Sequence, residues 1–225
     1  MSMPYYVAPE QMMKDRADYA RKGIARGRAL VALQYDDGIA LVAENPSNTL
    51  RKISEIYDRI AFAGVGKYNE FDQLRVAGVR AADLKGYQFS RLDVDARGLA
   101  NQYAQILGQT FTHEMKPLEV EILVAEVGLT PDRDQLFHIM YDGTVIDEHR
   151  FTVLGGDMDA IRGRLSDRFV AGSTIQNAVK IAHHALSSVD SSINSSELEV
   201  AVLTRNSSRR CFDRLSEDTI AQYLV

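Results

Sequence analysis

The chain has 225 residues, of which 45% are hydrophobic and 25% are charged. This is the composition of an ordinary globular protein, and it excludes a disordered or fibrous chain. The chain has 26 Lys and Arg against 31 Asp and Glu, and the resulting formal net charge of −5 argues against nucleic-acid binding. No apolar run approaches the ~20 residues that are needed to span a bilayer.

The single cysteine and the N-terminal residues indicate the cellular compartment of the protein. Cys211 is the only cysteine, so the chain cannot form an internal disulfide or a cysteine-based zinc site. This suits a reducing compartment, and we expect Cys211 to be a small buried side chain. The opening residues lack the basic region and hydrophobic stretch of a signal peptide. The sequence therefore predicts a cytoplasmic protein without a membrane anchor.

The first third of the chain predicts one helix and four strands. Pro9 fits a first helical turn, and four apolar residues follow it at helical spacing, namely Met13, Ala17, Ala20 and Ile24. Strand-like runs at residues 29–35 and 39–43 flank Asp36-Asp37-Gly38, a turn of the kind that joins antiparallel strands. Two short apolar runs at residues 53–56 and 60–65 indicate two further strands.

Two helix pairs interrupt the strands, and each helix offers one apolar stripe. The stripes of the first pair are Tyr68, Phe71, Leu74 and Ala81, then Leu99, Tyr103, Ile106 and Thr110. The stripes of the second pair are Met158, Ile161, Leu165 and Phe169, then Ile175, Val179, Ala182 and Leu186. We expect Ser173 to be the N-cap of the last of these helices.

The remaining segments predict more strands and a final helix. Strand patterns occur at residues 120–127, 136–141, 151–154, 198–202 and 210–213. The serine-rich stretch 187–196 is expected to be a flexible loop. Ser216 is expected to cap the last helix, with Leu215 packed against Ile220.

The order of these elements predicts the fold class. Strands come in blocks that are separated by helix pairs, whereas a parallel βαβ fold needs strands and helices to alternate one to one. Antiparallel sheets must therefore dominate. Two sheets packed face to face, each covered by a helix pair, would bury every apolar face. The sequence thus predicts an α+β fold, a four-layer αββα sandwich, in a single domain over residues 1–225.

The common catalytic and ligand-binding motifs do not occur in the sequence. Neither Gly-x-Ser-x-Gly nor a phosphate-binding P-loop occurs. Gly64-Val65-Gly66 lacks the third glycine of a dinucleotide fingerprint. The five histidines do not have metal-ligand spacing. We therefore expect no cofactor and no metal.

Six segments carry the pattern of one known family. They are residues 22–27, 31–38, 43–47, 51–58, 63–72 and 196–203. Together they resemble the α-type subunit of the 20S proteasome in its actinobacterial form, over nearly the whole chain. The αββα sandwich of that family agrees with the fold expected from the residues alone. The resemblance implies a barrel of four seven-membered rings, with α rings outside and β rings inside.

The catalytic β subunits of that family use an N-terminal threonine at the head of the first strand. Here that position reads Gly27-Arg28-Ala29, so cleavage after Gly27 would expose an arginine, which is no nucleophile. Glu44 and Lys52 fall where β subunits keep an acidic residue and near their catalytic lysine, but they have no nucleophile to serve. The resemblance implies a non-catalytic subunit of a threonine-type endopeptidase complex. The alternative is a self-processing N-terminal-nucleophile hydrolase.

The resemblance also implies that Lys52 lines a pocket between neighbouring α subunits. There the lysine pairs with the terminal carboxylate of an activator's hydrophobic-Tyr-x tail, a strong type of hydrogen bond. Gly27 and Gly66 match glycines beside the pocket, where an incoming backbone can approach closely. Without the family context, Lys52 would be read as an ordinary surface lysine. The segment between Glu44 and Lys52 is shorter than in archaeal relatives, so we expect a different pocket wall.

The residues before the first helix match the family's gate segment, residues 1–8, whose seven copies would converge at the ring axis. The candidate gate residues are Met3, Pro4, Tyr5, Tyr6, Val7 and Ala8. A frayed chain end is the alternative. The domain would then divide into the gate, a helical region at residues 9–26 and a sandwich at residues 27–225.

The family implies four kinds of partner. They are other α subunits in a seven-membered ring, proteasome β subunits, a ring-shaped ATPase activator bound through its C-terminal tail, and unfolded protein substrates. It implies no nucleic acid and no membrane. In the first helix, the stripe Met13, Ala17 and Ala20 fits an intrachain packing face or a subunit contact, and the sequence leaves both open.

Overall fold

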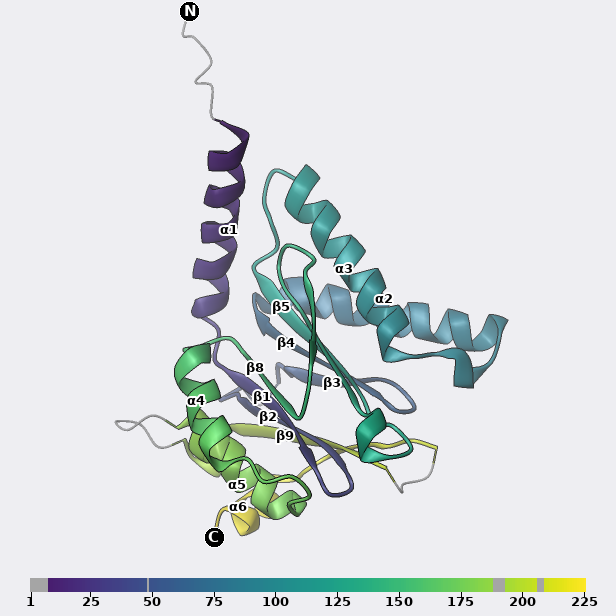
Figure 1. Cartoon of the computed structure of the whole chain (residues 1–225), viewed down its shortest axis with the longest axis vertical. Helices are drawn as coiled ribbons and strands as arrows, with labels where there is room; N and C mark the ends of the chain where they lie inside the picture. Colours follow the sequence, from purple (N-terminus) through teal and green to yellow (C-terminus); the bar gives the residue numbers. More distant parts are fainter. Residues whose placement is uncertain (1–7, 48, 188–192, 206–208) are drawn as a thin grey trace, which may run out of the picture.

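The computed structural model describes residues 8–47, 49–187, 193–205 and 209–225. Within them, two five-stranded sheets lie face to face between layers of helices (Figure 1). The first sheet contains, in spatial order, β10 (Phe212–Arg214), β9 (Leu198–Thr204), β2 (Gly38–Glu44), β1 (Leu30–Tyr35) and β8 (Phe151–Leu154). The second contains β3 (Ile53–Tyr57), β4 (Ile60–Gly66), β5 (Val120–Glu126), β6 (Gln135–Ile139) and β7 (Val145–Glu148).

All strand pairs are antiparallel, and the predicted hairpin forms between β1 and β2. In its register, Leu30 pairs with Ala43 and Tyr35 pairs with Gly38. β9 pairs with β2 over seven positions, although the two strands lie far apart in the sequence. This pairing places β9 inside the first sheet, between β2 and the edge strand β10.

The helices form the outer layers of the sandwich. The second sheet is covered by α2 (Tyr68–Gln88) and α3 (Ala96–His113), and the first sheet by α4 (Met158–Arg168), α5 (Ile175–Leu186) and α6 (Glu217–Leu224). Short 3₁₀ turns form at η1 (Arg91–Asp93), η2 (Pro131–Arg133) and η3 (Ser195–Glu197). The predicted αββα sandwich is therefore confirmed.

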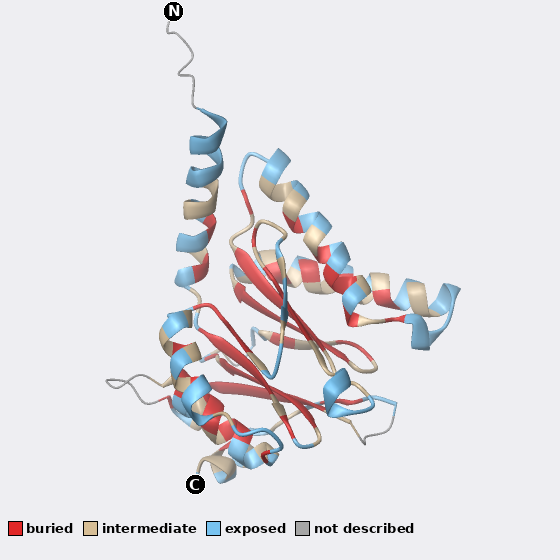
Figure 2. Cartoon of the chain, viewed as in Figure 1, coloured by how far each residue is buried: buried red, intermediate tan, exposed pale blue. Residues whose placement is uncertain are grey.

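Three apolar clusters hold the layers together, because alternate residues of a strand point to opposite faces of its sheet. Leu30 and Ala32 of β1 belong to the cluster between the sheets. Val31 and Leu33 belong to the cluster between the first sheet and its helices. A third cluster lies between the second sheet and α2 and α3. Figure 2 shows buried residues along the central strands and exposed residues on the outer helix surfaces.

The N-terminal helix α1 (Pro9–Ala25) is divided between two environments. Ala20 and Ile24 are buried in the cluster between the sheets, and Ala17 packs against it. Met12 and Met13 remain 47% and 36% exposed, on the half of the helix that stands away from the sandwich in Figure 1. The C-terminal half of the predicted stripe is thus an intrachain packing face, whereas the N-terminal half is open on this chain.

One predicted helix cap is wrong by one residue. The N-cap of α5 is Thr174, whose side chain accepts a hydrogen bond from the Asn177 amide, and not Ser173. The backbone carbonyl of Ser173 accepts from the Asp36 amide at 2.9 Å, which ties Ser173 to the β1–β2 turn before the helix starts. The cap of α6 is Ser216, as predicted.

Three other features differ from the sequence analysis. Leu99 and Tyr103 of the predicted α3 stripe are buried, but Ile106 is 39% exposed, because the stripe continues through Leu107 instead. Strand β7 was not predicted, since it is a half-exposed edge strand without a continuous apolar face. The serine-rich stretch is not all loop, because it runs into the 3₁₀ turn η3, while residues 188–192 lie outside the described residues. Cys211 is buried, as predicted.

Candidate functional site

Lys52 immediately precedes β3, and its side chain points back toward the start of the first sheet. Its ammonium Nζ donates a hydrogen bond to the backbone carbonyl of Arg28 at 2.6 Å. Burial lowers the pKa of Lys52 from its usual 10.5 to about 8, because a desolvated ammonium is disfavoured. The carboxylates of Glu44 and Glu199 oppose this shift, and the Arg28 guanidinium adds to it. Lys52 is therefore a half-buried amine whose pKa of about 8 lies close to neutral pH.

Gly27 and Gly66 lie against each other beside this lysine. A Cβ atom on Gly27 would lie 2.9 Å from the Gly66 amide nitrogen. Gly66 has a φ of +109° and a Cβ there would collide with the carbonyl oxygen of Glu119, so only glycine fits. Gly27 is followed directly by Arg28, whose carbonyl accepts the Lys52 hydrogen bond. The structure thus brings the three predicted docking residues into one neighbourhood.

The head of β1 holds a charge cluster. The Arg28 guanidinium forms an ion pair with Glu44 of β2. The neighbouring residue, Ala29, accepts a backbone hydrogen bond from the Glu44 amide at 3.1 Å. Residues 26–30 carry no hydroxyl or thiol side chain. The head of β1 thus holds paired charges and presents backbone groups, and its residues 26–30 supply no hydroxyl or thiol nucleophile.

Glu199 of β9 was missed by the sequence analysis. Its side chain is 2% exposed and forms an ion pair with Arg214 of β10. It also accepts hydrogen bonds from the backbone amides of Lys52 at 2.9 Å and Ile53 at 3.2 Å, and from Asn45 Nδ2 at 2.7 Å. A charged residue in the otherwise apolar run at residues 198–203 was the signal that could have revealed it.

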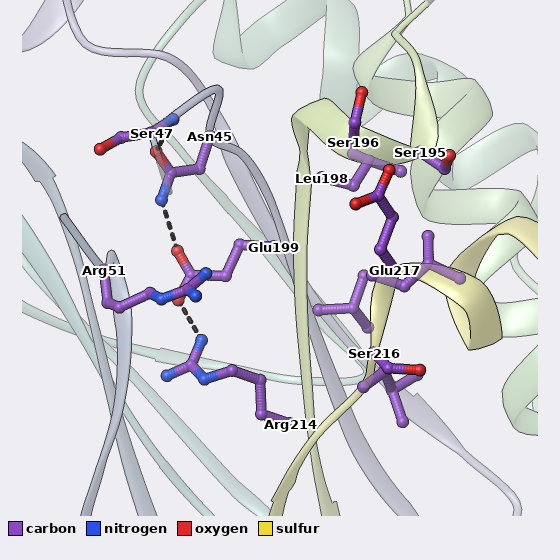
Figure 3. A pocket seen from close by; sticks show the side chains of 13 residues that line it. Asn45, Ser47, Arg51, Ser195, Ser196, Leu198, Glu199, Arg214, Ser216 and Glu217 are labelled. Atoms are coloured by element: carbon purple, nitrogen blue, oxygen red, sulfur yellow. Dashed lines mark hydrogen bonds and ion pairs between the residues drawn. The ribbon is translucent and has the colours of Figure 1, made fainter. Parts of the chain in front are cut away.

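A polar pocket of about 320 Å³ opens beside Glu199. Figure 3 shows Asn45 and Arg214 reaching Glu199 from opposite sides, with Arg51 close by and Ser196 and Glu217 across the pocket. The pocket therefore lies next to the segment that carries Lys52.

The comparisons with known proteins show the family of the chain. A family model described as "Proteasome subunit" matches residues 24–203. The chain belongs to this family. It is 62% identical over 224 residues to a protein named proteasome subunit alpha from Acidimicrobium ferrooxidans, with 100% of this chain and 97% of that protein covered.

Two further relatives carry the same name. The protein from Sanguibacter keddieii is 58% identical, with 100% of this chain and 90% of that protein covered. The protein from Kineococcus radiotolerans is 57% identical, with 100% and 99% covered. The resemblance to actinobacterial proteasome α subunits is therefore confirmed along the full chain.

The remaining predictions for this proteasome-family chain concern its N-terminus, metals and membranes. Met3, Pro4, Tyr5, Tyr6 and Val7 lie outside the described residues, and Ala8 is exposed just before α1. Among the described residues, no three His, Cys, Asp or Glu side chains form a group that could hold a metal ion. No helix in the described part of the chain is both long and apolar enough to cross a bilayer.

Proposed function

We propose that this chain is a non-catalytic α subunit of a 20S proteasome core particle. It forms a seven-membered outer ring with other α subunits and stacks on β subunits in the cytoplasm. The curated relatives that support this assignment are named proteasome subunit alpha and match the chain over its full length. The complex degrades unfolded proteins, and the β subunits supply its catalytic threonine.

The absence of catalysis in this chain rests mainly on the head of β1. Arg28 stands there, with its guanidinium paired to Glu44 and its carbonyl bonded to Lys52. A nucleophile at this position would need a hydroxyl or thiol and a free α-amine. Arginine has no hydroxyl or thiol, and the α-amine of Arg28 is not free, because α1 precedes it in the chain. This argues against the alternative of a self-processing hydrolase.

The docking of a ring-shaped ATPase activator is assigned to Lys52, Gly27 and Gly66. An ammonium has three donors, and among the described residues Lys52 gives one of them to the Arg28 carbonyl, which leaves two for a carboxylate. Gly27 and Gly66 pack against each other and against Val65 and Glu119, which fixes the backbone next to Arg28 and hence the carbonyl that Lys52 binds. These features support binding of a C-terminal carboxylate.

The gate is assigned to residues 1–8, which precede α1. Met12 and Met13 of α1, close to this segment, are half-exposed. Exposed apolar side chains of this kind support a contact with a neighbouring subunit. A second exposed group lies near the turn between α2 and α3 and includes Leu84, Tyr87, Phe89 and Leu92. Such surfaces are typical of subunits that pack against partners.

The assignment is tested by co-expressing the chain with its β partner. Electron microscopy should show stacked seven-fold rings, and N-terminal sequencing should find residues 1–27 retained. Particles without seven-fold rings would contradict the α-subunit assignment. A chain that begins at residue 28 would favour the self-processing hydrolase.

A further inference from the structure

Glu199 is a carboxylate whose capacity to accept hydrogen bonds is fully used within the chain. Its Oε2 accepts from Asn45 Nδ2 and from the Lys52 amide, and its Oε1 accepts from the Ile53 amide and from Arg214. A carboxylate has about four acceptor sites, so these four donors saturate it. Glu199 therefore has no free site for a ligand in the adjacent pocket, and its role must lie in what it holds.

The groups that Glu199 holds belong to the segment that carries Lys52. Two of the donors are the consecutive amides of Lys52 and Ile53. The same Asn45 side-chain amide also donates to the Leu50 carbonyl at 2.8 Å, two residues before Lys52. Arg214 also donates to the Ile53 carbonyl at 2.6 Å. Glu199 and its partners thus fix the main chain on both sides of Lys52.

The Lys52 side chain is consequently anchored at both ends. Its backbone is held by Glu199 on β9, and its ammonium is held by the Arg28 carbonyl at the head of β1. A long lysine side chain loses much rotamer freedom when it is fixed in this way. With both anchors present, the ammonium is already in place before a partner arrives, which lowers the cost of binding.

Stability alone is a weak reason for this arrangement. A buried ion pair such as Glu199 with Arg214 often contributes no more than apolar residues of the same volume would. Two consecutive backbone amides bonded to one carboxylate do, however, define the position of a strand end. The bonding of Glu199 is therefore better explained by positioning of the start of β3 than by stabilisation of the fold.

We propose that Glu199 is a positioning residue that holds Lys52 for docking of an activator's terminal carboxylate. This inference rests on the docking role proposed for Lys52. Glu199 does not touch the docked tail. It fixes the start of β3, and Asn45 and Arg214 complete the support.

The test measures binding of a synthetic peptide that ends in Ile-Tyr-Leu with a free carboxylate to particles assembled with the β partner. Glu199→Gln keeps the size of the side chain but turns one acceptor oxygen into an amide donor that faces N–H groups. We expect it to weaken binding about tenfold, within the range of coupling between residues of one hydrogen-bond network. The same peptide with an amidated terminus should bind weakly to wild type and to Glu199→Gln alike.

The matched control is Asp134→Asn. Asp134 is 0% exposed, is paired with Arg205, and also accepts from the Gly128 amide at 2.8 Å. It is thus buried and bonded much as Glu199 is, but it lies near the opposite end of β9 from the Lys52 segment. We expect Asp134→Asn to lower the melting temperature and leave peptide binding unchanged.

A pH profile separates positioning from a general loss of stability. The charged groups around Lys52 are Arg28, Glu44 and Glu199, and Glu199 raises the pKa of the lysine. Removing the Glu199 charge should lower the pKa of Lys52. Peptide binding should then be lost at a lower pH than in wild type. Asp134→Asn should leave that pH unchanged.

The outcomes distinguish this inference from the docking proposal beneath it. If Lys52→Ala weakens binding while Glu199→Gln binds like wild type, the positioning role is wrong and the docking role stands. If Lys52→Ala itself binds like wild type, the docking role fails. If Glu199→Gln does not assemble, Arg214→Lys keeps a positive charge but loses the fork that reaches both Glu199 and the Ile53 carbonyl. Unchanged peptide binding by that variant would overturn the positioning role.

Discussion

Arg205 and Asp134 form a two-point ion pair, with Nη1 2.8 Å from Oδ1 and Nη2 3.0 Å from Oδ2. Their side chains are 7% and 0% exposed. Arg205 follows β9 in the first sheet, and Asp134 lies in the loop between β5 and β6 of the second. The pair therefore joins the two sheets, and each buried charge depends on the other for its compensation.

Arg205→Met should destabilise the chain by about 3–5 kcal/mol, because it leaves the Asp134 carboxylate buried without its cation. The measurement is the melting temperature of the separately expressed chain, beside wild type and the double variant Arg205→Met with Asp134→Leu. The double variant should recover part of the loss, since it removes both charges. A double variant less stable than Arg205→Met would contradict this account.

Two glycines give opposite expectations for the same substitution. Gly66→Ala should strongly destabilise the chain, because φ is +109° and the new Cβ would collide with the Glu119 carbonyl oxygen. Gly163 lies inside α4, and a Cβ added there would have no atom of the described residues beyond its own helix turn within 4 Å. Gly163→Ala should therefore stabilise by up to about 1 kcal/mol through helix propensity. Denaturant midpoints would check both, and equal effects would contradict the geometric argument.

Docking to Lys52 should depend on pH in a defined direction. Its pKa of about 8 means that the ammonium is charged below this pH and neutral above it. Binding of a peptide carboxylate should therefore be strong at neutral pH and weaken as the pH rises through 8. Lys52→Ala should weaken binding more than about tenfold and remove the pH dependence. Lys85→Ala, which removes an exposed lysine paired with Asp95, is the control and should change neither.

The purified chain without β subunits should hydrolyse no peptide, because Arg28 occupies the position of the nucleophile. A fluorogenic peptide assay with and without a threonine-directed inhibitor checks this. Activity that stays with the chain through purification and responds to the inhibitor would refute it.

Deleting residues 2–8 should raise the basal peptide hydrolysis of the assembled particle. Met3, Pro4, Tyr5, Tyr6 and Val7 are apolar for a chain end, and seven copies that meet at one axis would bury part of that surface. Ordering the segment costs roughly 1–2 kcal/mol per residue, so the plug should be weakly held. Labelling of the β active sites should show equal subunit incorporation. Equal basal rates would then mean that the segment is only a frayed end.

Local patterns in the sequence were sufficient to predict most of the fold. The β1–β2 hairpin depends on two neighbouring strands and an Asp-Gly turn, so its signal lies within a few residues. The stripes of the helices are equally local, because residues three and four apart share a face. Ile106 was wrongly placed in the buried stripe of α3, and β7 was missed, because burial depends on which elements cover a residue, and periodicity does not record this.

The candidate site also has a part that the sequence predicts and a part that depends on the tertiary structure. Lys52, Gly27 and Gly66 could be named from the sequence only through its resemblance to a known family, and their proximity depends on the sandwich that brings α1, β3 and β4 together. Glu199 is 147 residues from Lys52 in the chain, and only the pairing of β9 with β2 places its carboxylate at the start of β3. The sequence alone determined which residues carry charge and which turns are possible. Only the tertiary structure decided which charges meet, because partners of buried groups are chosen by contacts between segments that are distant along the chain.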